Sequence, residues 1–141
     1  MSEPSTGVKG LWHVALNVKD LRRSQRFYEQ VFGMQVVWQP DADNVYLTSG
    51  RDNLALHQIT PSELPRYETA PGQYLDHLGF IMESPETVDR LFIEVERRRM
   101  TIVKPPKQHR DGSYSFYLAD PDGNTVQVLY EPTVSANELH T

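Results

Sequence analysis

An internal repeat constrains the fold of this 141-residue chain more than any other feature. The segment HVALNVKDLRRSQRFYEQVF, which starts at His13, aligns with HLGFIMESPETVDRLFIEVE, which starts at His77. Further along, NVYLTSGRDNLALHQI aligns with YSFYLADPDGNTVQVL, and this second alignment pairs His57 with Gln127. We therefore expect one structural unit to occur twice, once in each half of the chain.

The residue pattern of each copy predicts a strand, then a helix, then three further strands. Its first strand alternates apolar and polar residues, and an amphipathic helix follows. Asp20 and Ser84 are suitable N-caps, Pro85 fits the first position of its helix, and Gly33 fits the residue that ends the first helix. The later strands are expected over residues 35–39, 44–49 and 53–59, and again over 101–104, 113–119 and 125–130.

These elements predict an α+β fold built from two tandem βαβββ modules within one domain, residues 1–141. Module one spans about residues 8–59 and module two about 74–131, and the proline-containing segment 60–73 is the expected linker. A chain of this length can bury a substantial core as a single domain.

Composition excludes several classes of function. The net charge is −5 and no basic stripe offsets it, which argues against a nucleic-acid partner. No run of 18 apolar residues predicts a membrane span, and the N-terminus lacks the apolar core of a signal peptide, so we expect a cytoplasmic protein. The absence of cysteine excludes disulfides, thiolate metal sites and a cysteine nucleophile.

Strand periodicity places a set of polar residues on one face of the expected sheets. Successive side chains of a strand point to opposite faces, and the apolar ones must face the helices. The remaining face then carries His13, His57, His77 and Gln127. If the two sheets curve toward each other, these four side chains converge.

Three imidazoles at repeat-related positions indicate a metal site. Imidazole binds Zn, Fe, Mn, Ni or Co, with the geometry deciding among them, and the amide oxygen of Gln127 can complete the set. His109 lies in the polar loop KQHRDG and His140 in the tail, and neither has a repeat-related partner. We expect neither of them in the site.

The segments LWHVALNVKDLRRSQRFYEQVFGM, LDHLGFIM and SFYLADPDGNTVQVLYEP resemble the vicinal oxygen chelate superfamily, the group of glyoxalases, bleomycin resistance proteins and extradiol dioxygenases. The resemblance covers about residues 8–131. It implies a U-shaped cup of curved mixed sheet around a divalent metal, commonly in a homodimer.

Carried over by position, the resemblance assigns roles to individual residues. His13 and His77 match the first-strand ligands of the family, and His57 matches a position where glyoxalases use glutamate or glutamine. Gln127 matches the last-strand ligand, which is usually glutamate, so this chain departs from the pattern there. Tyr117 resembles the tyrosine that extradiol dioxygenases and fosfomycin-modifying transferases place beside the substrate.

Two functions remain open from the sequence. In the first, a metal-dependent lyase, isomerase or ring-cleaving dioxygenase holds its ion through His13, His57, His77 and Gln127, and Tyr117 donates a hydrogen bond to an anionic substrate with vicinal oxygens. In this reading His57 serves either as a ligand or as a base. In the second, the protein binds no metal and sequesters a small cationic molecule on aromatic surface formed by Trp12, Trp38, Tyr46 and Tyr117.

Overall fold

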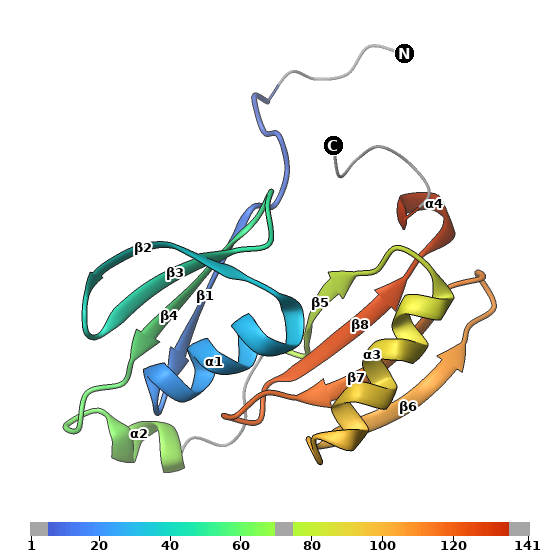
Figure 1. The fold of residues 1–141 in the computed structure, drawn as a ribbon. Helices are drawn as coiled ribbons and strands as arrows, with labels where there is room; N and C mark the ends of the chain where they lie inside the picture. Colours follow the sequence, from blue (N-terminus) through green and yellow to red (C-terminus); the bar gives the residue numbers. More distant parts are fainter. Residues whose placement is uncertain (1–5, 70–74, 136–141) are drawn as a thin grey trace.

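The computed structural model describes residues 6–69 and 75–135, which form two modules lying side by side (Figure 1). The elements of module one are β1 (His13–Val18), α1 (Leu21–Phe32), β2 (Gln35–Asp41), β3 (Asn44–Thr48) and β4 (Asn53–Gln58), followed by α2 (Leu64–Thr69). The elements of module two are β5 (Leu78–Ile81), α3 (Pro85–Arg97), β6 (Ile102–Gln108), β7 (Tyr114–Ala119), β8 (Thr125–Tyr130) and α4 (Pro132–Ser135).

Each module contains one four-stranded mixed sheet. The strand orders are β1-β4-β3-β2 and β5-β8-β7-β6. The first strand of each module pairs in parallel with the last, and the other neighbours pair in antiparallel fashion. The α+β fold with two βαβββ modules is therefore confirmed. None of the helices in the described ranges is long and apolar enough to cross a membrane.

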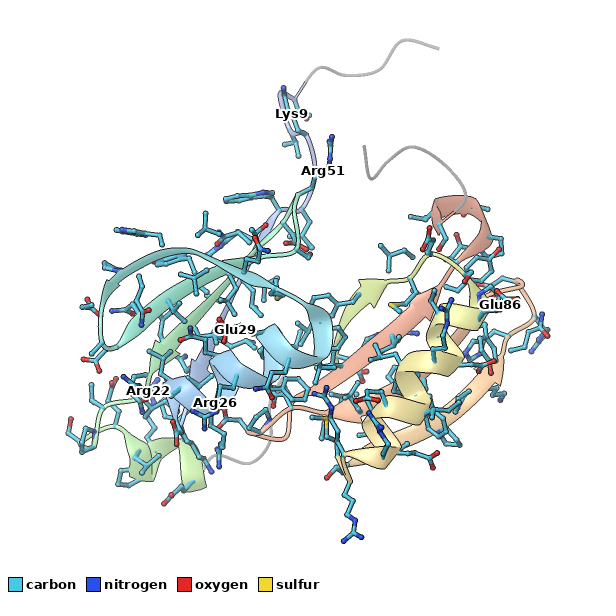
Figure 2. The ribbon with its side chains drawn as sticks, viewed as in Figure 1. Lys9, Arg22, Arg26, Glu29, Arg51 and Glu86 are labelled. Carbon is cyan, nitrogen blue, oxygen red and sulfur yellow. The ribbon has the colours of Figure 1, made fainter. Side chains whose placement is uncertain are left out.

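The helix ends form at the residues that the sequence predicts. The side chain of Asp20 accepts a hydrogen bond from the backbone N–H of Arg23, and Gly33 ends α1 with a φ of 67°. Ser84 and Thr87 form a reciprocal capping box at the start of α3. The outward face of α1 carries Arg22 and Arg26, which are exposed to solvent (Figure 2).

Two elements differ from the sequence expectation. Helix α2 lies inside the segment expected to be only a linker, of which residues 70–74 lie outside the described residues. Strand β6 continues past Lys104 through Pro105 and Pro106. It can do so because it is an edge strand and its pairing with β7 is irregular between Lys104 and Lys107, so the missing N–H groups interrupt no regular ladder.

The buried core lies between each sheet and its long helix. In both modules the inward-facing strand residues are apolar and shielded from water, which is the face that periodicity assigned to the helices. The core strand residues are Leu16, Val18, Val45, Leu47, Leu54 and Leu56 in module one, and Phe116, Leu118, Val126 and Val128 in module two.

The two modules contact each other on the helix side of their sheets. The ring of Phe32 at the end of α1 stacks on Phe80 of β5, with ring centroids 4.0 Å apart. Tyr28 of α1 donates a hydrogen bond of 2.7 Å to Asp120. Asp122, in the same turn between β7 and β8, accepts hydrogen bonds of 3.1 Å from the backbone of Lys19 and from the hydroxyl of Ser24.

Candidate metal and substrate site

The candidate site residues lie on the sheet faces that the helices leave uncovered. In β1, Leu16 and Val18 are buried, whereas His13 is exposed. In β8, Val126 and Val128 are buried, whereas Gln127 is half-buried on the other face. Tyr117 pairs directly with Gln127 across β7 and β8 and therefore shares its face.

Strand register corrects the second alignment of the repeat. Gln127 pairs with Gly79, two residues after His77, and the corresponding residue of module one, Ala15, pairs with Ala55. The structural counterpart of Gln127 is therefore Ala55 and not His57. The sequence alignment was wrong by two residues because apolar residues alternate along both strands, so a shift of two preserves the apolar pattern.

The same register matches Tyr46 with Tyr117. Tyr46 pairs with Ala55, just as Tyr117 pairs with Gln127. Each module thus places one tyrosine near its first-strand histidine. The ring centroids are 6.3 Å apart for His13 and Tyr46, and 5.3 Å apart for His77 and Tyr117.

His57 lies apart from the other candidates of module one. It is level with Asn17, four residues along β1 from His13, which corresponds to about 13 Å at the rise of a strand. Its Nδ1 lies 2.6 Å from Oδ1 of Asn44, its partner across β3 and β4.

The single chain does not bring the three histidines together. Across residues 6–69 and 75–135, no group of three or more His, Cys, Asp or Glu side chains is placed to hold a metal ion. The expected convergence of His13, His57 and His77 is therefore wrong for one isolated chain. Within module one, His57 is level with Asn17 and lies four residues along β1 from His13, so these two histidines cannot share an ion.

The two first-strand histidines nevertheless have the hydrogen bonds of metal ligands. Nδ1 of His13 lies 2.6 Å from the amide oxygen of Asn53, and Nδ1 of His77 lies 2.7 Å from a carboxylate oxygen of Asp76. Because both oxygens can only accept, each Nδ1 donates the hydrogen bond, and in the neutral imidazole this tautomer leaves the lone pair on Nε2. Fixing the tautomer through the outer nitrogen is typical of histidines that bind metals.

The face of module two around His77 is polar and free of acidic strand residues. The described strands β5 to β8 contain no Asp or Glu. The Nζ atom of Lys104 lies 5.2 Å from the centre of the Tyr117 ring, and a cavity of about 340 Å³ is lined by Lys104, Lys107, His109, Ser115 and Tyr117 among others. The part of this face around Tyr117 therefore favours an anionic group, whereas the carboxylate of Asp76 lies beside His77.

The corresponding face of module one is aromatic. Trp38 packs beside Tyr46 with ring centroids 5.0 Å apart, and Trp12 lies beside His13 at 6.1 Å. Both tryptophans are 59% exposed, an unusual exposure for the largest apolar side chains. A second cavity of about 1250 Å³ lies at the junction of the modules, where Trp12 and His77 line it together with Phe32 and Phe80.

Sequence reasoning missed two polar residues that contact the site. The hydroxyl of Ser115 lies 3.1 Å from Nε2 of Gln127 and 3.3 Å from Nε2 of His109. Ser115 shares the face of Tyr117, two residues away along β7, so strand periodicity alone could have found it. His109 carried no such signal, because only the β6–β7 hairpin brings it next to Ser115.

Three known proteins illustrate the similarity of the chain to others. It is 31% identical to 2,2',3-trihydroxybiphenyl dioxygenase of Sphingomonas paucimobilis over 89% of its own length, although it spans only 42% of that protein. It is 25% identical to the metallothiol transferase FosB of Lysinibacillus sphaericus, covering 85% of this chain and 81% of the transferase. The crystal structure of a lactoylglutathione lyase from Agrobacterium tumefaciens superposes with a TM-score of 0.70 at 26% identity, covering 90% of this chain and 97% of the lyase.

The chain also matches the model of a protein family. The model of the Glyoxalase/Bleomycin resistance protein/Dioxygenase superfamily matches residues 10–128, a range that contains His13, His77, Tyr117 and Gln127. The paired βαβββ modules agree with that match. The chain belongs to the Glyoxalase/Bleomycin resistance protein/Dioxygenase superfamily.

Proposed function

We propose that this chain is a divalent-metal-dependent enzyme that binds its ion through His13, His77 and Gln127 and takes a small anionic substrate with two vicinal oxygens. The observation that carries the proposal is the pair of Nδ1 hydrogen bonds, from His13 to Asn53 and from His77 to Asp76. These bonds leave two imidazole Nε2 atoms as ligands, and Zn, Fe, Mn, Ni and Co all accept imidazole.

Three protein ligands leave room for a chelating substrate. Ala55 occupies the position that corresponds to Gln127 and has no donor atom. An open coordination sphere is typical of catalytic rather than structural metal sites. The bound ion would supply Lewis acidity toward the substrate oxygens.

The neutral ligand set favours an anionic substrate. Neither the imidazoles nor the amide of Gln127 offsets the charge of a divalent cation, so a catecholate or other oxyanion would supply the missing negative charge. Lys104, beside Tyr117, adds a positive charge near that position. The phenol of Tyr117 would donate a hydrogen bond to the substrate oxygen nearest His77 and orient it.

Among the reactions of the group, we favour ring cleavage of a vicinal aromatic diol. Proton transfer at carbon, the step of an isomerase, requires a base, and neither Ala55 nor Gln127 can accept a proton there. The similarity to the trihydroxybiphenyl dioxygenase supports the same choice, although the chain spans less than half of that protein. The aromatic side chains Trp38 and Tyr46 are suited to cover a flat ring.

We further propose that the site is completed between two copies of the chain. Within the described part of one chain, no three His, Cys, Asp or Glu side chains are grouped to hold an ion, so a second copy is needed to complete such a group. Trp38, beside Tyr46 on the face of His13, is 59% exposed, as expected for a face that packs against a partner. In a homodimer, module one of one copy would face module two of the other.

Metal binding tests the first part of the proposal. After treatment with a chelator, the purified untagged protein should bind one divalent ion per chain in isothermal titration calorimetry, and the variant with both His13→Ala and His77→Ala should bind none. With Fe(II) added under anaerobic conditions, a catechol should then drive oxygen uptake when air is admitted. A wild-type protein that takes up none of Fe(II), Zn, Ni, Mn or Co would end the proposal.

Complementation tests the homodimer. His13→Ala and His77→Ala, each inactive alone, are mixed or co-expressed so that mixed dimers form. If each site takes His13 from one copy and His77 from the other, every mixed dimer regains one intact site and half of its metal capacity. If both histidines come from the same chain, mixing restores nothing.

A metal-free binding protein is the second candidate, and the exposed aromatic surface favours it. Trp12, Trp38 and Tyr46 could stack on a cationic aromatic molecule in a protein whose net charge is −5. Calorimetry with such a cation after chelator treatment separates the two functions. Binding that survives His13→Ala with His77→Ala, and is lost in Trp38→Ala, would favour this second function.

A further inference from the structure

The amide of Gln127 lies against a hydroxyl that is almost completely buried. Ser115 is 1% exposed, and its Oγ lies 3.1 Å from Nε2 of Gln127. On the other side of the amide, a β-carbon built on Gly79 would lie 3.5 Å from Oε1 of Gln127, so the amide oxygen extends over the glycine of β5. The two ends of the amide thus have different neighbours.

The hydrogen-bonding capacity of Ser115 distinguishes these two ends. A serine hydroxyl has a single hydrogen to donate and can also accept. Oγ of Ser115 also lies 3.3 Å from Nε2 of His109, and a neutral imidazole protonated at Nδ1 accepts a hydrogen bond at Nε2. The NH₂ group of Gln127 donates to Oγ of Ser115, which leaves the hydroxyl hydrogen for an acceptor, and the Nδ1-protonated tautomer of His109 offers one at Nε2.

We propose that Ser115 and His109 are positioning residues that hold the Gln127 amide with its NH₂ group toward β7 and its oxygen toward the ligand. The inference rests on the proposed function, because it concerns which atom of Gln127 the metal meets. An amide nitrogen has no lone pair for a metal, so an amide turned by 180° removes one of three protein ligands. A glutamate would need no such control, since its two oxygens are equivalent.

The first test compares metal affinity in variants of His109. Removing an outer partner of a metal ligand typically lowers affinity 10- to 100-fold, and because His109 acts through Ser115 we expect roughly a tenfold loss of Co²⁺ affinity for His109→Ala. His109→Gln, whose amide oxygen can accept the serine hydrogen, should recover most of that loss. Gln108→Ala, an exposed neighbour, is the control and should bind Co²⁺ as wild type does.

The decisive test repeats the measurement with a carboxylate at the site. In the Gln127→Glu background, His109→Ala should leave Co²⁺ affinity within about twofold, because there is no amide to orient. A purely structural role for His109 would lower the affinity equally in both backgrounds. Equal losses would therefore overturn the inference.

A metal-free readout keeps the inference separate from the proposed function. With ¹⁵N-labelled glutamine, the side-chain amide signal of Gln127 is identified by its disappearance in Gln127→Glu. We expect an NOE from this NH₂ group to Ser115 in the metal-free protein, and its loss in His109→Ala but not in Gln108→Ala. If the wild-type protein binds no metal but shows this NOE pattern, the proposed function fails and the proposed orientation of the Gln127 amide stands. An NOE from the NH₂ group to Ser115 that His109→Ala leaves unchanged refutes that orientation.

Discussion

The phenol oxygen of Tyr28 lies 2.7 Å from Oδ2 of Asp120, and this buried hydrogen bond joins α1 of module one to the turn between β7 and β8 of module two. Asp120 also accepts hydrogen bonds from the backbone and side chain of Asn124, which hold the turn in shape. The contact therefore couples the placement of two halves that otherwise have separate sheets.

Removing the Tyr28 hydroxyl should destabilise the fold. Tyr28→Phe leaves the ring in place but deletes a buried hydrogen bond to a charged group, which typically contributes about 2 kcal/mol. Urea denaturation should show this loss at neutral pH. Tyr114→Phe deletes a tyrosine–aspartate bond of the same kind, to Asp89 at the protein surface, and should have a far smaller effect. Similar losses in both variants would mean that burial does not matter here.

The same tyrosine should give the fold a distinctive response to alkali. Burial, reinforced by the neighbouring Asp120 carboxylate, raises the pKa of Tyr28 well above its ordinary range. In the unfolded chain the phenol loses its proton near pH 10, while the folded protein retains it, so stability falls as the pH rises above about 10. Below that pH this group adds no pH dependence.

The comparison with Tyr28→Phe isolates that contribution. The variant lacks the ionisable group, so the stability difference between wild type and variant should narrow by about 1.4 kcal/mol per pH unit above pH 10. Urea midpoints at pH 8, 10 and 11 measure it. A difference that stays constant over this range would show that Tyr28 ionises as readily in the folded protein as in the unfolded chain.

Restoring a carboxylate at Gln127 should tighten metal binding. Gln127→Glu adds a negative ligand at a position where the proposed set has none, and we expect at least roughly a tenfold gain in Co²⁺ or Zn²⁺ affinity. Gln108→Glu adds the same charge at an exposed position outside the site and controls for long-range attraction. An affinity that rises equally in both variants would place Gln127 away from the ion.

His57 and His13 should differ sharply in their effect on the metal. Register places His57 four residues along the sheet from the level of His13, whereas Ala55 is the counterpart of Gln127. His57→Ala should therefore change metal affinity less than about twofold, while His13→Ala should lower it at least 100-fold through the loss of a direct ligand. A comparable loss from His57→Ala would restore that residue to the ligand set.

Local sequence signals predicted most of the fold because each acts over a few residues. Asp20 and Ser84 cap the starts of their helices and Gly33 ends α1, each through contacts within one turn. Strand alternation places Leu16 and His13 on opposite faces of β1. The edge position of β6 escaped prediction, since Pro105 normally argues against a strand and only the sheet order explains why it is tolerated there.

The site was harder to predict because it depends on register and on contacts between distant segments. Periodicity identified the face that bears Gln127 and Tyr117, yet it could not distinguish Ala55 from His57, which lie two residues apart on the same face. The contact of His109 with Ser115 requires the folded β6–β7 hairpin. The arrangement of the two modules, which the contacts of Phe32 with Phe80 and of Tyr28 with Asp120 fix, has no local signal at all.

The difference between Ala55 and Gln127 has a consequence for stereochemistry. A cup made from two identical modules would offer any bound molecule two equivalent orientations, related by the pseudo-twofold axis of the repeat. A donor on one module and a methyl group on the other removes that degeneracy. A duplicated and nearly symmetric scaffold can in this way distinguish the two ends, or the two faces, of a small substrate.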